Sequence, residues 1–294
     1  MTSASIFHPQ FQVVSDLHLE TPLVQPSYST FKLNLEASYL CLLGDIGLAK
    51  DDGLYVFLES LLKRTPNLTI LYLLGNHEAY QMTLEAAEEK MRTFAKTVAR
   101  TYGNRFIFLN RTRYDVNPTI TILGCTLWSH ILPSQMAEVE ARLTDFNQVR
   151  GIREWGLEEH LKEHQQDVAW LNSEVEKMHN EEPERQIIVF THHSPTIDPR
   201  ANNPIHTNST VRSGFVTDLS SELCWKSAQV KLWAFGHTHY SFSYREEGTN
   251  KLVMANQKGY IGLGEKPESS NNGSKVIEAA GDTWGILPTR SYTV

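Results

Sequence analysis

The organisation of this chain is clearest in residues 68–78, LTILYLLGNHE, where an apolar run ends in a polar turn. The run over residues 68–74 has the length and composition of a buried β-strand. Gly75 then allows a tight turn, and Asn76, His77 and Glu78 follow with amide, imidazole and carboxylate side chains. The segment therefore predicts a strand that delivers polar groups at its carboxyl end.

Similar apolar runs recur along the chain, and most of them come just before a polar motif. They predict strands at residues 11–15, 39–43, 119–123, 186–190 and 230–235. Helical spacing of apolar residues lies between several of them and predicts helices at residues 54–63, 83–102 and 157–179. This alternation predicts an α/β layer architecture.

The segments between and after these elements complete the expected organisation. Residues 240–245 and 251–255 flank a polar turn and predict a hairpin, so part of the sheet is antiparallel. Residues 128–156 and 198–214 are expected to form long loops that act as lids. From residue 265 the chain turns polar before regaining apolar residues at 276–294, so we expect one domain over 1–264 and a flexible C-terminal arm over 265–294.

Composition limits the classes of partner. The 294 residues are 40% hydrophobic and carry a formal net charge of -7, which argues against a nucleic-acid or anionic-lipid surface. No segment approaches the roughly 20 apolar residues of a membrane-spanning helix, and residues 1–9 lack the features of a signal peptide. Three widely spaced cysteines in apolar stretches, Cys41, Cys125 and Cys224, predict free thiols in a reducing compartment. We expect a cytoplasmic protein with no membrane partner.

Five short motifs carry side chains that bind metals. Since each follows a predicted strand, we expect them to meet at the carboxyl-end edge of a sheet. Their carboxylates, imidazoles and amide suit divalent or trivalent metals such as Mn, Fe or Zn, and the absence of thiolates disfavours softer ions. A carboxylate on the tight Gly44-Asp45 turn is suited to bridge two ions, which together can clamp a displacement at phosphorus. The motifs are Asp16-Leu17-His18, Gly44-Asp45, Gly75-Asn76-His77-Glu78, Thr191-His192-His193 and Gly236-His237-Thr238-His239.

In this order the motifs resemble those of the calcineurin-like metallophosphoesterases, whose pattern is D-x-H, G-D, G-N-H-[DE], a later H and G-H-x-H. The resemblance implies a single-domain α/β/β/α sandwich of mixed β-sheets flanked by helices, with a dinuclear metal site. It implies that Asp45 is shared by two ions, with His77 facing the leaving group and Glu78 able to orient its ring. His192 is preferred over His193 as a ligand. By the same resemblance one ion is held by Asp16, His18, Asp45 and His239, and the other by Asp45, Asn76, His192 and His237.

The activity implied is hydrolysis of a phosphoester by a hydroxide that bridges two metal ions. The protein Ser/Thr phosphatases of this superfamily carry an arginine soon after the second aspartate, whereas here residues 46–50 read Ile-Gly-Leu-Ala-Lys. Without that bidentate clamp, a small-molecule phosphodiester or phosphomonoester is favoured over a phosphoprotein. The alternatives are a metal-binding scaffold without catalysis and a nuclease.

Other polar residues have simpler interpretations. His160, His164 and His179 fall in a polar helical stretch and are expected on a solvated face, and Asp51-Asp52 is expected to cap the helix near Leu54. For two groups of residues, two interpretations stay open: they pack in the structure or are ordinary polar loop residues, or they line a substrate pocket. They are Tyr80 with Trp128, Ser129 and His130, and Asn203 with His206 and Arg212.

Overall fold

The first of two β-sheets is built around the strand that precedes the Gly75 turn. The computed structural model describes residues 9–259, 275–280 and 283–287. Four strands of this sheet run parallel, and two antiparallel strands from the end of the chain are added beside the first of them. The spatial order is β12 (Thr283–Ile286), β11 (Lys275–Ala280), β1 (Gln10–Val14), β2 (Tyr39–Leu43), β3 (Thr69–Leu73) and β4 (Phe106–Phe108).

The second sheet has a parallel centre and an antiparallel strand at each edge. β5 pairs antiparallel with β6, and β9 pairs antiparallel with β10, which confirms the predicted hairpin. The other pairings are parallel. The order is β5 (Thr112–Asn117), β6 (Ile120–Gly124), β7 (Gln186–Phe190), β8 (Val230–Phe235), β10 (Leu252–Ala255) and β9 (Phe242–Arg245).

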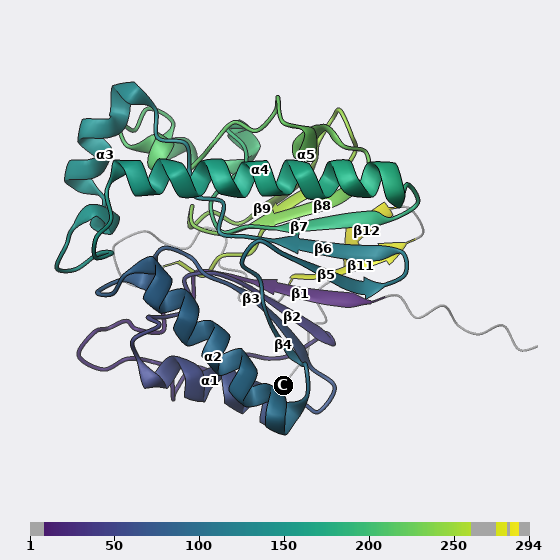
Figure 1. Cartoon of the computed structure of the whole chain (residues 1–294), viewed down its shortest axis with the longest axis horizontal. Helices are drawn as coiled ribbons and strands as arrows, with labels where there is room; N and C mark the ends of the chain where they lie inside the picture. Colours follow the sequence, from purple (N-terminus) through teal and green to yellow (C-terminus); the bar gives the residue numbers. More distant parts are fainter. Residues whose placement is uncertain (1–8, 260–274, 281–282, 288–294) are drawn as a thin grey trace, which may run out of the picture.

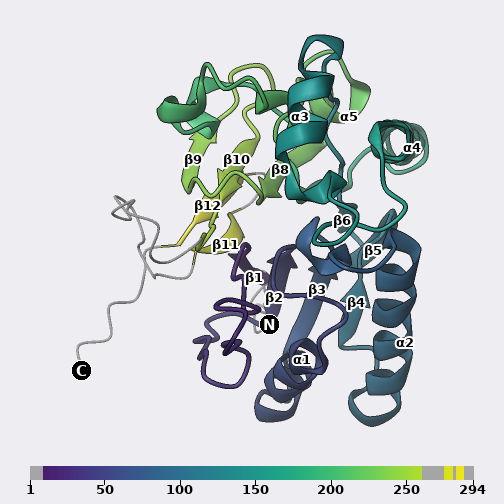
Figure 2. The ribbon, with the colours of Figure 1, turned by 90° about the vertical axis from the view of Figure 1, so that its left-hand side faces the viewer.

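The alternation of side chains along the strands produces four layers. In β2, Leu40 and Leu42 pack in the cluster that contains α1 (Asp52–Arg64) and α2 (Leu84–Tyr102), whereas Cys41 and Leu43 lie between the sheets. In β7, Ile187 and Val189 face the cluster with α4 (Leu157–Glu181) and α5 (Leu223–Lys226), while Ile188 and Phe190 lie between the sheets. Figures 1 and 2 show α1 and α2 on one side of the paired sheets and α4 on the other. The α/β/β/α sandwich is therefore confirmed as a single domain.

The predicted strands and helices are all present. More than half of their ends differ from the prediction by one or two residues, and the others agree with it. Two predictions need correction. Asp51 occupies the N-cap position of α1, but its side chain makes no capping bond and instead accepts a hydrogen bond from Tyr28 Oη at 3.1 Å. Part of the predicted flexible arm is sheet: β11 pairs with β1, and Trp284 of β12 is fully buried between the sheets. Residues 265–274 and 288–294 of that arm lie outside the described residues.

The two predicted lid segments contain short helices and contact each other. Residues 128–156 include α3 (Met136–Arg142) and 3-10 turns at Pro133–Gln135 and Thr144–Phe146. Residues 198–214 include 3-10 turns at Pro199–Ala201, Pro204–His206 and Arg212–Gly214. The backbone N–H of Leu132 donates to Ser213 Oγ at 3.1 Å, and Arg142 Nη1 lies 2.9 Å from Thr210 Oγ1. Among the described helices, none is both long enough and apolar enough to cross a membrane.

Candidate metal centre

Five parallel strands bring the sequence motifs to one place. Their carboxyl ends carry the motif residues directly, because each motif begins within two residues of the end of β1, β2, β3, β7 or β8. Backbone hydrogen bonds join the motifs to each other: Asp16 N–H donates to Gly44 O at 3.0 Å, and Gly236 N–H donates to His192 O at 2.9 Å. The motifs therefore converge, but they follow strands of two sheets, β1, β2 and β3 in the first and β7 and β8 in the second, rather than of a single sheet.

The glycines of these motifs are required by close packing. Gly44 has φ +83°, and a Cβ there would lie 2.5 Å from both Gly75 N and His192 Nδ1. A Cβ on Gly75 would lie 2.1 Å from Asp45 Oδ1. Side chains at either position would displace the groups that the site uses.

Several of the polar residues themselves adopt a rare backbone conformation. Asp16, His18, Asp45, His237 and His239 have φ between 46° and 69°, in the left-handed region that non-glycine residues seldom occupy. Such strain persists where the surrounding structure enforces it, and it is concentrated at functional sites. Because five clustered polar residues share this conformation, the cluster is a candidate functional site rather than an ordinary junction of loops.

The side chains form two groups with Asp45 between them. In the first group, His239 Nε2 lies 3.0 Å from His18 Nε2 and 3.5 Å from Asp16 Oδ1. In the second, His192 Nε2 lies 3.5 Å from Asp45 Oδ1, and the ligand atoms of Asp45, His192 and His237 all lie within 4.8 Å of one another. Asp45 Oδ2 is also 3.9 Å from His18 Nε2, so this carboxylate faces both groups.

Outer contacts fix which atoms face the centre of the second group. His192 Nδ1 lies 2.8 Å from Leu43 O, so it carries a proton and Nε2 is the ring nitrogen available to a metal. His192 Nε2 is 3.2 Å from Asn76 Oδ1. The amide nitrogen of Asn76 donates to Asp145 Oδ1 at 2.8 Å, which directs its oxygen toward the imidazole. His237 Nε2 lies 3.4 Å from Gly214 O, which leaves Nδ1 as its acceptor nitrogen.

The donor set fits two metal ions. Two imidazole nitrogens only 3.0 Å apart, at His18 and His239, need a proton or a cation between their lone pairs. Burial lowers the pKa of His237 well below its usual range and keeps its ring neutral, the form that binds metal. Carboxylate, imidazole and amide donors without a thiolate suit manganese, iron or zinc. The residues present could therefore hold one ion in each group.

Charge interactions shape the pKa values around Asp45. Burial opposes ionisation of Asp45, but the charges of His192 and His77 outweigh it and hold its pKa well below the usual range. Burial lowers the pKa of His77, whereas the charge of Asp45 and a hydrogen bond with Glu20 raise it, to about 9. Cations beside Asp45 would counter its charge and bring the pKa of His77 down again.

His192 and His193 occupy different environments. The ring of His192 joins Asp45. Among the described residues, His193 belongs to neither of the two groups nor to a third candidate group made of His18, Asp45 and His77. His193 is fully buried, and its ring lies 4.0 Å from that of His237 and 5.1 Å from that of Trp128. The geometry is thus consistent with the preference for His192.

The expected role of Glu78 is wrong. This fully buried carboxylate accepts hydrogen bonds from the backbone N–H groups of Asp45, Ile46 and Gly75 and from Tyr72 Oη, at 2.8–3.0 Å. It therefore shapes the turn that carries Asp45. The carboxylate that contacts the ring of His77 is Glu20, at 3.0 Å.

Two contributors to the site were missed from the sequence. Glu20 lies two positions after His18 and directly after Leu19, which is buried, and this gives only a weak local signal of an inward carboxylate. Asp145 comes from the first lid segment and accepts hydrogen bonds from Asn76 and, at 2.6 Å, from Tyr80 Oη. Its distance of 69 residues from Asn76 along the chain hides the pairing.

The other candidate residues lie away from the two ligand groups or support them. His160 and His164 are buried, which corrects the predicted solvated face: Ser129 O lies 2.9 Å from His160 Nε2, and Trp128 O lies 2.6 Å from His164 Nδ1. Trp128 is itself buried in this packing. His130 is exposed, and His179 is exposed as predicted. In the second lid segment, Asn203 caps a 3-10 turn, His206 is exposed, and Arg212 donates to Ile197 O.

Comparisons with known proteins agree with this architecture. A family model described as calcineurin-like phosphoesterase matches residues 10–241. The uncharacterized protein L509 of Acanthamoeba polyphaga mimivirus is 26% identical over 262 residues, covering 84% of this chain and 90% of that protein.

Two solved structures share the fold. Phosphopantetheinyl hydrolase (PptH) from Mycobacterium tuberculosis has a TM-score of 0.60 at 13% identity, covering 86% of this chain and 90% of its own. A dimetal phosphatase from Danio rerio has a TM-score of 0.52 at 12% identity, covering 92% of this chain and 93% of its own. With the family model spanning most of the sequence, the chain belongs to the calcineurin-like phosphoesterase family.

Proposed function

We propose that this protein hydrolyses a small-molecule phosphoester at a dinuclear metal site. The observation that carries the proposal is the position of Asp45, whose two carboxylate oxygens face the two separate ligand groups. Two ions bound there would generate a nucleophile from water near neutral pH and stabilise charge at phosphorus. One ion is assigned to Asp16, His18, Asp45 and His239, and the other to Asp45, Asn76, His192 and His237.

The chain also supplies a proton donor beside the proposed ions. His77 Nε2 lies 3.9 Å from Asp45 Oδ2, and the ring is partly exposed at 16% of its side-chain surface. A hydrogen bond with Glu20 favours the protonated ring, and this contact does not depend on the charge of Asp45 that bound cations would counter. His77 thus acts as general acid toward the leaving oxygen, a role typically worth about 10²–10⁴-fold in rate.

The choice of a small substrate rests on the residues that come directly after Asp45. The turn continues as Ile46-Gly47-Leu48, and its backbone is tied to Glu78 rather than to a guanidinium. A bidentate arginine clamp for a phosphoryl group is therefore not supplied by this turn. Both phosphodiesters and phosphomonoesters remain within the proposal, with manganese, iron or zinc as the metal. The three buried free thiols, Cys41, Cys125 and Cys224, support a cytoplasmic location.

Paired chromogenic phosphate mono- and diesters test the proposal. The metal-depleted protein should be inactive, and resupplied Mn should restore turnover of at least one of the two esters. His77→Ala should keep its metal yet lose turnover, most strongly for poor leaving groups. Turnover that is independent of metal would reject the dinuclear site as the source of the activity. Tight metal binding without turnover of any phosphoester would reject the enzyme in favour of a metal-binding scaffold.

A further inference from the structure

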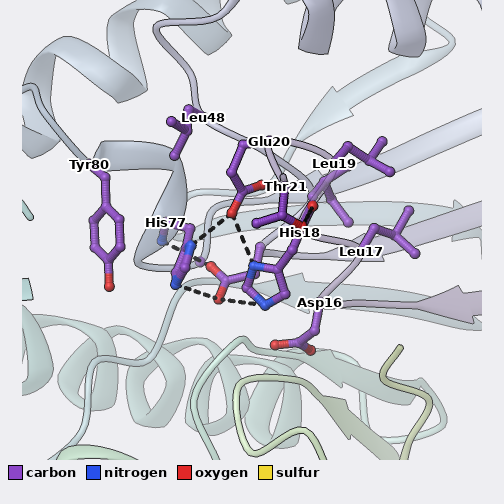
Figure 3. A network of polar contacts seen from close by, with 12 residues as sticks. Asp16, Leu17, His18, Leu19, Glu20, Thr21, Leu48, His77 and Tyr80 are labelled. Atoms are coloured by element: carbon purple, nitrogen blue, oxygen red, sulfur yellow. Dashed lines mark hydrogen bonds and ion pairs between the residues drawn. The ribbon is translucent and has the colours of Figure 1, made fainter. Parts of the chain in front are cut away.

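Glu20 places one carboxylate oxygen between two histidines of different proposed function. Its Oε1 lies 3.0 Å from Nδ1 of His77 and 3.2 Å from Nδ1 of His18. The side chain is only 3% exposed. Figure 3 shows Glu20 reaching toward both rings from the chain that continues beyond His18. The Nε2 atoms of the two rings contact Asp45.

This arrangement fixes the proton positions on both rings. An ionised carboxylate only accepts hydrogen bonds, so each Nδ1 must donate a proton to Glu20. The Nε2 atoms then face Asp45, and each lies 3.9 Å from its Oδ2. For His18 this is the ring nitrogen that a metal needs, and for His77 it is the nitrogen that would deliver a proton to a leaving group.

The two imidazole contacts are the main interactions of the Glu20 side chain. Among the described residues, its second oxygen Oε2 is buried without a hydrogen-bond partner. A buried carboxylate is costly unless it is paired, so its retention points to the two imidazole contacts.

We propose that Glu20 is a positioning residue that locks His77 and the metal ligand His18 in one orientation, so that the acid stays aligned with the ion beside it. This inference rests on the proposed function, because it assigns His77 and His18 their roles there. It also predicts that the two contacts of Glu20 have separate effects. The Oε1 contact to His77 acts on proton delivery, and the contact to His18 acts on metal affinity.

The positions of the two carboxylate oxygens of Glu20 suggest which substitutions test the proposal. In Glu20→Gln, the amide oxygen can take the place of Oε1 and the NH₂ group the place of Oε2, so both imidazole contacts survive. In Glu20→Met, the length of the side chain is kept but no acceptor remains. Asp52→Asn is the matched control, because it removes a carboxylate at the start of α1, on the wall of a cavity of about 460 Å³ that Glu20 also lines.

The first readout is kinetic, at saturating Mn, with leaving groups of graded acidity. Glu20→Met should lower kcat about 10–100-fold for poor leaving groups with little change in KM, while Glu20→Gln recovers most of the rate and Asp52→Asn matches wild type. In a His77→Ala background, Glu20→Met should cause no further loss of kcat. An additional loss in that background, or equal loss for Gln and Met, would overturn the role in positioning His77.

The second set of readouts does not depend on turnover. Glu20→Met should weaken Mn binding about 10–100-fold by calorimetric titration, with recovery in Glu20→Gln. In metal-depleted protein, the ring N–H proton signals of His18 and His77 should be present in wild type and Glu20→Gln and lost in Glu20→Met. Unchanged affinity and unchanged signals in a folded Glu20→Met protein would refute the inference, even if no substrate were turned over and the proposed function had failed.

Discussion

Glu78→Gln is the substitution that best separates the structure from the role expected from the sequence. Glu78 Oε2 accepts the N–H groups of Asp45 at 3.0 Å and Gly75 at 2.8 Å, and Oε1 accepts Ile46 N–H and Tyr72 Oη, both at 2.8 Å. Glutamine keeps the shape of the side chain but turns one acceptor into a donor. With the amide nitrogen at Oε2, two backbone N–H groups would lose their acceptor. With the amide nitrogen at Oε1, only the N–H of Ile46 would lose its acceptor, because the Tyr72 hydroxyl can rotate and accept a hydrogen bond from the amide.

The second orientation therefore sets the magnitude. One buried N–H without a partner costs about 1–3 kcal/mol, and two remaining bonds change from charge-assisted to neutral at about 1 kcal/mol each. Removal of the cost of burying the charge offsets part of this loss. We expect the free energy of unfolding to fall by about 2–4 kcal/mol. Metal affinity should fall as well, because the loosened turn carries Asp45.

Urea unfolding of metal-depleted protein measures the first effect, and calorimetric titration with Mn measures the second. Glu140→Gln, an exposed change in α3, should stay within about 0.5 kcal/mol of wild type. The dependence of kcat on the leaving group should be retained at saturating metal. Wild-type stability and metal affinity, combined with loss of that dependence, would refute the structural role and return Glu78 to orienting His77.

Three other substitutions probe separate parts of the account. Gly75→Ala should lower the free energy of unfolding by about 1–3 kcal/mol and abolish tight Mn binding in calorimetric titration, because its Cβ would lie 2.1 Å from Asp45 Oδ1. Gly285→Ala, whose Cβ meets nothing within 4 Å, should bind Mn normally in the same titration. Trp284→Ala should lower the free energy of unfolding by about 3–5 kcal/mol in urea, because the ring is fully buried between the sheets; a change under 1 kcal/mol would contradict that packing. His160 has its pKa lowered from 6.5 to about 3 by burial, so the unfolded chain takes up its proton first and folding stability falls as pH drops below 6.5. From pH 6.5 to 5 this costs about 2 kcal/mol, and His160→Gln should remove that part of the pH dependence, measured by urea unfolding at both pH values; an identical dependence in the variant would contradict it.

The fold and the clustering of the candidate ligands were accessible from the sequence because both are encoded locally. Each strand is a short apolar run, and each motif follows within a few residues, so Asp16 and Asp45 lie at the carboxyl ends of neighbouring strands of one sheet and His237 at the carboxyl end of a strand of the other. Four of the described strands were not predicted. β4 has only three residues, β5 is an edge strand that mixes polar with apolar residues, and β11 and β12 come after a polar stretch.

The supporting contacts were not accessible because they depend on tertiary neighbours. Polar residues surround His160 along α4, yet the side chain meets Ser129 from a loop 31 residues away and is fully buried. Glu78 is next to His77 in sequence, but the turn of Gly75–Glu78 directs it to the backbone of Asp45. Sequence adjacency therefore assigned the wrong carboxylate to His77, and the correct one lies 57 residues away.

The central claim is that Asp45 joins two metal ions in one site, and the number of ions per chain tests it most directly. Elemental analysis of protein reconstituted with Mn and freed of unbound metal should give two ions per chain for wild type. Asp45→Asn, which keeps the side-chain shape but removes the shared charge, should retain fewer than one. A wild-type value of one, or two ions retained by Asp45→Asn, would contradict the shared carboxylate on which the proposed function depends.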